Sequence, residues 1–238
     1  MKSIIYKANS RGHFENDWLN TRYSFSFADY FDRSRIHFGA LRVLNDDIIQ
    51  PTGGFGKHPH DNMEIITVPL SGKLAHQDSM GHKQEIKVNE VQVMSAGSGI
   101  FHSEFNASQV EECSLLQIWI YPSAKNIKPR YDQKYFDPEL AKDNWQLLVS
   151  GHDNLNGALS IHQNAIISRI YLTSGNNKTY TLNEQSFGSF VFVIKGEIEI
   201  DNNKLLERDS IGIYDTKSFE IKAKRDAQIL NIEVPDIQ

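Results

Sequence analysis

Short runs of apolar, often β-branched residues recur along the chain between turn signals, and many of them alternate with polar residues. Alternation at every second position is typical of β-strands with one buried face, whereas the spacing of an amphipathic helix is scarce in this sequence. The clearest expected strands are residues 41–44, 64–70, 85–88, 91–94, 115–121, 190–194, 197–200 and 210–214. Many short strands at such spacing are typical of β-sandwiches and β-barrels. The pattern therefore predicts an all-β protein.

The segment from Pro122 to Asn144 interrupts this rhythm with prolines and charged residues, and it is the best candidate for a connector between two halves. A similar phrase occurs in each half: VPLSGKLAHQ precedes EIKVNEVQVM, and FVIKGEIEID precedes LLERDSIGIY. In both phrases an apolar strand reaches a glycine, Gly72 or Gly196, and continues into another strand. This internal repeat suggests two related units.

The composition narrows the function class. The chain has 238 residues, enough for one large domain or two of ordinary size, and a formal net charge of -5. Since it has no cluster of Lys or Arg, we expect neither nucleic acid nor an anionic membrane surface as a partner. Apolar runs such as residues 190–194 are far too short to span a bilayer. Cys113 is the only cysteine, which excludes a disulfide framework, a cysteine zinc site and a CxxC pair, and the protein is expected to be cytoplasmic.

Two short segments carry metal-binding residue types in pairs two positions apart. His58 and His60 lie either side of Pro59 in FGKHPHDNME, and His102 and Glu104 lie in GSGIFHSEFN. Residues i and i+2 of a strand point to the same face, so each pair would project together from an extended segment. If the two pairs face each other, three imidazoles and one carboxylate meet, a ligand set suited to Fe, Mn, Ni, Co, Cu or Zn. The alternative is that these histidines are surface or hydrogen-bonded core residues, which are commoner than ligands.

The same segments resemble the two motifs of the cupin superfamily. The first motif, HxHxxxE followed by a glycine, is matched by His58, His60, Glu64 and Gly72. The segment SAGSGIFHSEFN resembles the second motif, although Ser95 stands where proline is usual and Asn89 where glycine is usual.

More specifically, the phrases TRYSFSFADYF, FGKHPHDNMEI, AHQDSMG, MSAGSGIFHSEFN and LQIWIYP are similar to the pirin family, in the same order and across most of the first 135 residues. The resemblance implies a bicupin, two tandem β-barrels of the double-stranded β-helix or jelly-roll type. It implies an N-terminal cupin domain at residues 1–135 that binds metal, and a degenerate C-terminal cupin domain at residues 136–238 that binds none. The sequence agrees, because no histidine follows His162, and we expect the second domain to be a structural partner.

The resemblance also implies that the carboxylate ligand comes from the second motif, so the expected metal ligands are His58, His60, His102 and Glu104. Glu64 is a rival ligand, because its parity matches that of the two histidines before it on a regular strand. A bulge after Pro59 would turn Glu64 away. We hypothesise that Glu64 instead holds one ligand imidazole in its tautomer.

Four protein ligands on a metal that accepts six leave positions open, which is typical of catalytic sites. Resemblance to pirins implies quercetin 2,3-dioxygenase-like activity, in which O2 opens the heterocyclic ring of a flavonol, with Fe(II) the favoured metal. Glu104 or Glu64 would act as catalytic residue by accepting the proton of the flavonol hydroxyl. An aromatic pocket is expected, lined by about two of six candidate phenylalanines. These candidates are Phe25, Phe27, Phe38, Phe55, Phe101 and Phe105.

Two other function classes stay open. One is a redox-responsive metal protein that binds a regulatory protein partner without turnover. The other is a cupin sugar isomerase, which needs a cationic phosphate pocket, and only Lys57 lies near the site motifs. His76 and Asp78 share one strand face, so they either reach the site or form an ordinary hydrogen-bonded pair. The remaining histidines have no partner at ligand spacing and receive no role: His13, His37, His82, His152 and His162.

Overall fold

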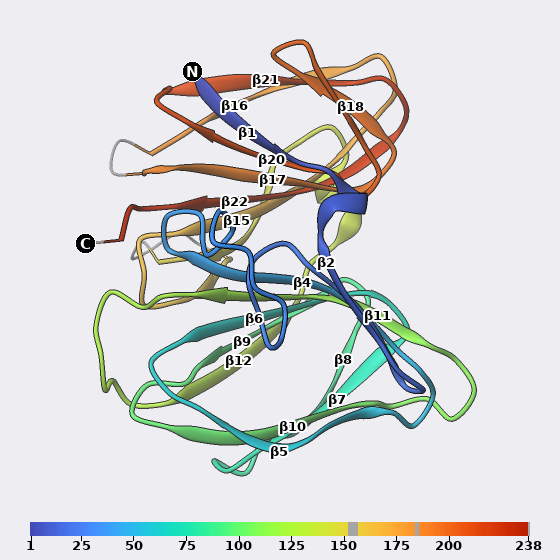
Figure 1. Cartoon of the computed structure of the whole chain (residues 1–238), viewed down its shortest axis with the longest axis vertical. Coiled ribbons are helices and arrows are strands. Elements are labelled where there is room, and N and C mark those ends of the chain that lie inside the picture. The colour runs from blue at the N-terminus through green and yellow to red at the C-terminus, as the bar shows by residue number, and fades with distance from the viewer. Residues whose placement is uncertain (152–156, 184–185, 238) are drawn as a thin grey trace.

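Four β-sheets stack in layers along the long axis of the molecule, with two seven-stranded sheets in the middle and a four-stranded sheet outside each of them (Figure 1). The computed structural model describes residues 1–151, 157–183 and 186–237. In these ranges strands dominate, with two short 3-10 helices, η1 (Ala8–Ser10) and η2 (Pro138–Ala141), and no α-helix. The prediction of an all-β protein is confirmed. No described helix is long and apolar enough to cross a membrane.

The first half consists of a central and an outer antiparallel sheet. The central sheet has the order β12 (Arg130–Tyr135), β9 (Glu90–Ser95), β6 (Glu64–Ser71), β11 (Cys113–Ile120), β4 (Leu41–Ile49), β3 (Leu19–Tyr23) and β2 (Gly12–Glu15). The outer sheet has the order β5 (Gly54–His60), β10 (Ile100–Asn106), β7 (Lys73–Asp78) and β8 (Lys83–Lys87). The strand β5 is therefore an edge strand of the outer sheet.

The second half repeats this arrangement. Its central sheet has the order β1 (Lys2–Tyr6), β20 (Ser210–Tyr214), β17 (Gly188–Lys195), β22 (Ala227–Val234), β15 (Ile166–Leu172), β13 (Gln146–Ser150) and β14 (Leu159–Ser160). Its outer sheet has the order β16 (Asn177–Thr181), β21 (Ser218–Ala223), β18 (Glu197–Ile200) and β19 (Asn203–Leu206). Backbone pairing of the described residues leaves the two sheets of each half separate, and their closure into barrels stays a prediction.

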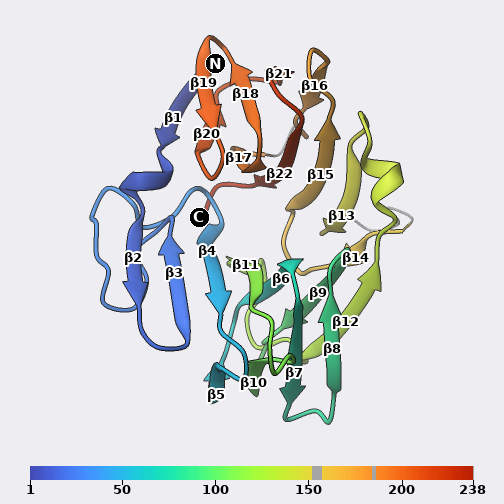
Figure 2. The ribbon, with the colours of Figure 1, turned by 90° about the vertical axis from the view of Figure 1, so that its right-hand side faces the viewer.

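The first strand of the chain lies with the second half. The strand β1 pairs antiparallel with β20, from Lys2 opposite Tyr214 to Tyr6 opposite Ser210 (Figure 2). Residues 1–135 therefore do not all pack into one half, although most of them do. The domain boundary at residue 135 stays a prediction.

The repeated phrases of the sequence occupy equivalent strand junctions. The strand β6 of the central sheet passes through Gly72 into β7 of the outer sheet, and β17 passes through Gly196 into β18 in the same way. Both glycines have positive φ, 67° and 93°, a backbone conformation that is energetically unfavourable for a residue with a Cβ atom. The two halves thus make the same sharp turn between layers.

The main hydrophobic core lies between the two central sheets. Alternate residues of β11, namely Leu116, Ile118 and Ile120, belong to this core together with residues of β17 and β22. Each fully buried Leu or Ile contributes about 1.5–3 kcal/mol, so this face joins the two halves. The intervening residues of β11, such as Gln117 and Trp119, point the other way, into the space between the first central sheet and its outer sheet. That space contains the predicted ligands.

Candidate metal centre

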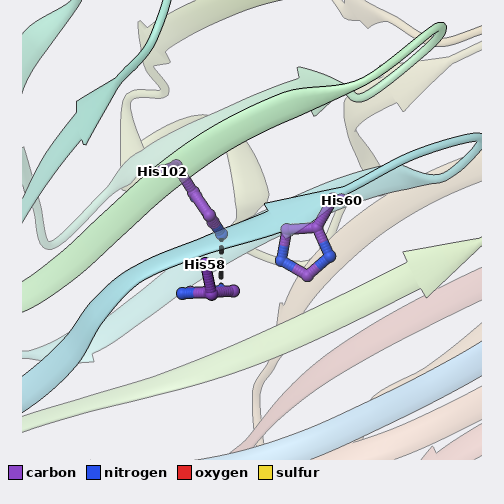
Figure 3. A group of neighbouring side chains, drawn as sticks. All are labelled: His58, His60 and His102. Carbon is purple, nitrogen blue, oxygen red and sulfur yellow. Dashed lines mark hydrogen bonds between the residues drawn. The ribbon is translucent and has the colours of Figure 1, made fainter.

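Three imidazoles meet on the inner face of the outer sheet of the first half. The strands β5 and β10 pair antiparallel with His58 directly opposite His102, and His60 lies two residues further along β5. The Nε2 atoms of His58 and His102 are 3.0 Å apart. The ring centroids lie 4.8 Å apart for His58 and His60, 4.5 Å for His58 and His102, and 4.7 Å for His60 and His102 (Figure 3). The predicted facing of the two sequence pairs is what brings these rings together.

Pro59 is compatible with this strand because of its position. It lies opposite Phe101, on the outward face of the sheet, while its histidine neighbours point inward. Proline cannot donate a backbone hydrogen bond, and an edge strand such as β5 tolerates this loss. The HPH segment therefore keeps the edge strand extended and places both imidazoles on one face.

Glu104 lies deeper than the three imidazoles. It is 4% exposed, and its carboxylate accepts a hydrogen bond of 3.1 Å from Nε2 of Gln117. Its ligand atom lies within 4.8 Å of those of His76 and His102, and the three imidazoles of His58, His60 and His102 form a second group of the same size. His102 belongs to both groups. Glu104 thus lies close to His102, on the side of His76. The spacing of the predicted ligands in the sequence did not include His76.

Burial sets the protonation of these groups. It lowers the pKa of His60 to about 4 and the pKa of His102 to about 2, since charging an imidazole costs more away from water. Neutral imidazoles have the free lone pair that a metal ion needs. Burial raises the pKa of Glu104 to about 7, and the nearby charge of Asp47 acts in the same direction. The donor set and its protonation fit a divalent transition metal.

Glu64 does not reach this cluster. The strand β5 ends at His60, and Glu64 begins the separate strand β6, so the parity argument that aimed it at the imidazoles does not carry across the turn. Its carboxylate accepts a hydrogen bond of 2.7 Å from Ser95 Oγ, and burial raises its pKa. Ile66, two residues further on the same face, belongs to the core between the halves. The described contacts of Glu64 therefore lie away from the three imidazoles, contrary to the expectation that it holds a ligand imidazole, and its role as a catalytic base stays a prediction.

His76 and Asp78 do reach the site, and Asp78 also contacts His82, to which no role was assigned from the sequence. Oδ2 of Asp78 lies 3.4 Å from Nε2 of His76 and 2.9 Å from Nδ1 of His82. The His82 ring stacks on Tyr131 with 4.8 Å between centroids. The sequence signal for His82 was its position four residues after Asp78 across a turn, whereas Tyr131 comes from the distant strand β12.

The other singled-out residues lie elsewhere. His13 contacts Asn20, and His37 contacts the carbonyl of Gly39. The backbone carbonyl of His162 accepts a hydrogen bond from Ser123, and His152 lies outside the described residues. Cys113 is buried.

A cavity of about 220 Å³ adjoins the imidazoles. Two of the six candidate phenylalanines, Phe27 and Phe55, line it together with His58, His60 and Trp119. The indole of Trp119 packs edge-on against His60, with 4.8 Å between centroids.

The other four phenylalanines do not line this cavity. Phe25 and Phe38 are part of the core between the halves, whereas Phe101 and Phe105 are 48% and 41% exposed on the outward face. The cavity has further lining residues that the sequence did not single out: Leu19, Thr21, Tyr23, Asn45, Asp47 and Gln117.

Comparisons with known proteins show the family to which the chain is related. The family model Pirin matches residues 6–120, and a model described as quercetinase C-terminal cupin domain matches residues 147–234. A quercetin 2,3-dioxygenase of Escherichia coli (strain K12) is 40% identical over 236 residues, which cover 98% of this chain and 100% of the relative. A pirin-like protein of Caulobacter vibrioides is 37% identical over 222 residues, which cover 93% of this chain and 95% of the relative.

A solved structure is similar over the same extent. The crystal structure of the bacterial pirin YhhW from Escherichia coli in complex with nickel(II) has a TM-score of 0.93 and 38% sequence identity, and the match covers 99% of this chain and 100% of that chain. The sequence resemblance, the stacked sheets and the histidine cluster all agree with this relationship. The chain therefore belongs to the pirin family, within the cupin fold.

Proposed function

We propose that the protein is a metal-dependent dioxygenase of the pirin type that cleaves a flavonol or a related polyphenol with O2. The observation that carries this proposal is the meeting of three inward-pointing imidazoles, with ring centroids 4.5–4.8 Å apart, beside an aromatic cavity. The name of the Escherichia coli relative, quercetin 2,3-dioxygenase, supports the same reaction class.

The ligands in this proposal are His58, His60, His102 and Glu104, in the metal-binding half of the chain. When bound, a divalent metal would supply a Lewis acid for the phenolic oxygen and open positions for small oxygen ligands. Fe(II) is the favoured metal, and nickel is a strong rival because the similar YhhW structure is described as a nickel(II) complex. Mn, Co, Cu and Zn accept the same donors.

The chain contributes positioning and proton transfer. Trp119, Phe27 and Phe55 pack against a flat ring and keep water from it. Gln117 holds the Glu104 carboxylate through its amide N–H. This carboxylate can take the proton of a flavonol hydroxyl.

Metal analysis coupled to quercetin turnover tests the proposal. We expect oxygen-dependent loss of flavonol absorbance that tracks metal content across preparations loaded with Fe(II), Ni(II) or Zn(II). Anaerobic samples should bind quercetin without consuming it. Turnover that survives complete chelation, or none with any loaded metal, would contradict the proposal.

A regulatory protein that binds a partner in a redox-dependent manner is the second candidate. The exposed rings of Phe101 and Phe105 favour this candidate, because they alternate with His102 and Glu104 along β10. A change in the oxidation state of the metal would therefore act on ligands whose neighbours in the strand are exposed. Redox-dependent partner binding without polyphenol turnover would support it. A sugar isomerase ranks last, because no Lys or Arg is among the described residues that line the cavity.

A further inference from the structure

The wall of the cavity opposite the imidazoles carries buried polar residues that the proposed metal chemistry does not use. Asp47 and Asn45 lie two residues apart on β4, so they share the face that points toward the outer sheet. Both line the cavity, and they are only 3% and 4% exposed. In the adjacent strand β3, Thr21 lies directly opposite Asp47. This polar wall faces the side of the cavity on which His58 and His60 lie.

Burying such groups costs free energy unless a partner satisfies them. The amide of Gln117, opposite Asn45 on β11, is already used, because it donates to Glu104 and its oxygen accepts from Trp119 Nε1 at 3.4 Å. In contrast, Oδ1 of Asn45 has no partner among the described residues. The chain thus leaves a buried acceptor without a partner on a residue that lines the cavity.

The chemistry of the wall selects the kind of group that would satisfy it. A carboxyl and an amide side by side can accept from and donate to a hydroxyl. A phosphate or carboxylate would be repelled by Asp47, and no cation is among the described lining residues to offset this repulsion. The aromatic side chains around the wall favour a flat ring that carries the hydroxyl.

From this arrangement we infer that Asp47 and Asn45 form a hydroxyl-recognition pair, which makes the site specific for phenols that carry free hydroxyls away from the oxygens that bind the metal. The inference rests on the proposed function, since it names the substrate class of that same site. It assigns specificity to two residues that belong neither to the ligand set nor to the cupin motifs. Aromatic substrates that only chelate the metal would leave the wall unsatisfied and would be poor substrates.

Two flavonols distinguish this inference from the proposed function. Quercetin carries several ring hydroxyls, and 3-hydroxyflavone has the same chelating hydroxyl and keto group but no other hydroxyl. The experiment measures kcat/KM for both compounds, and their anaerobic Kd, with metal-loaded wild type, Asp47→Leu, Asn45→Leu and Asp47→Asn. Gln92→Leu is the matched control, because Gln92 is a buried amide in the same sheet that does not line the cavity.

We expect wild type to prefer quercetin, and each leucine variant to lower the ratio of the two kcat/KM values about 10- to 100-fold, as expected for a buried hydroxyl that loses its partner. Asp47→Asn should keep most of the preference, since an amide can still bind a hydroxyl, and Gln92→Leu should keep all of it. Metal content and thermal midpoint identify any variant that fails to fold or load. If one leucine variant fails in this way, the other leucine variant decides the outcome.

A wild-type ratio near one, or ratios unchanged within about 2-fold in both leucine variants, overturns the inference while turnover of both compounds leaves the proposed function standing. If wild type turns over neither compound, the proposed function fails. The anaerobic Kd ratio then still decides whether the pair recognises hydroxyls, and absence of binding overturns the inference as well.

Discussion

The interiors of the two halves differ, although each lies between a seven-stranded and a four-stranded sheet. In the first half the inward-facing residues of β5 and β10 include three imidazoles, and a cavity of about 220 Å³ adjoins them. In the second half the same space is filled by a cluster of buried apolar residues, among them Ile170, Tyr180, Val191, Val193, Phe219, Ile221 and Ile229. The described groups of three potential metal-binding residues both lie in the first half. The two halves therefore share one architecture, and the residues at a few inward-facing positions decide whether a half contains a potential metal site.

The buried carboxylates of the two halves show the same difference. Glu233 of the second half accepts hydrogen bonds of 2.7 Å from the Tyr180 hydroxyl and the Asn183 backbone, and a further one from Ser186. Glu104 accepts hydrogen bonds from the amide of Gln117. A carboxylate whose lone pairs are used by its own chain is structural, whereas one with spare capacity can bind a ligand.

Removing the imidazole shared by both groups should have the largest effect. We expect His102→Ala to weaken metal binding by at least about 100-fold, since it removes a ligand rather than a neighbour of one. Calorimetric titration with Ni(II) measures the change. His37→Ala, at an exposed histidine bonded to a backbone carbonyl, is the control and should bind metal as wild type does. Equal affinity in both variants would argue against the site.

Exchanging the two candidate glutamates comes next. Glu104→Gln should lower metal affinity about 10- to 100-fold, because it removes the anionic ligand, while Glu64→Gln should leave affinity within about 2-fold. Bound metal after gel filtration distinguishes the two variants. Full retention of metal by Glu104→Gln would contradict the assignment of Glu104 as a ligand. Loss of metal in Glu64→Gln would indicate that Glu64 is a ligand.

The acid dependence of metal binding should follow Glu104. Its raised pKa of about 7 means that below this pH the metal must displace a proton from it, so Glu104 contributes a fall in affinity of about tenfold per pH unit below 7 that levels off above it. His60, with a pKa of about 4, adds no further loss until the pH is near that value. Titrations between pH 5 and 8 in Glu104→Gln should lose this slope, and an unchanged slope would point to another group.

The second half should respond in stability and not in metal binding. Glu233→Gln should lower the free energy of unfolding by about 1–3 kcal/mol, because a buried acceptor network loses its charge and one acceptor becomes a donor. Urea denaturation measures this loss. Glu220→Gln, at an exposed ion pair with Lys222, should change stability by less than about 0.5 kcal/mol. Loss of metal in Glu233→Gln would show that the two interiors are coupled.

The sequence was most informative where chemistry and strand period coincide. His58, His60 and His102 were predictable because pairs at i and i+2 project together, and the all-β fold followed from the same period. Glu64 was misplaced because the turn between β5 and β6 resets that period. Asp47 and Asn45 were missed because polar residues within a strand have no ligand spacing, and only the pairing of β3, β4 and β11 shows which face they line.

An anomalous difference map from crystals grown with Ni(II) or Fe(II) tests the central claim most directly. We predict one strong peak at about 2.0–2.2 Å from a nitrogen of His58, His60 and His102 and from a carboxylate oxygen of Glu104, with none in the second half. A peak held instead by His76, His102 and Glu104 away from His58 and His60, or the absence of any peak between these residues, would contradict the account.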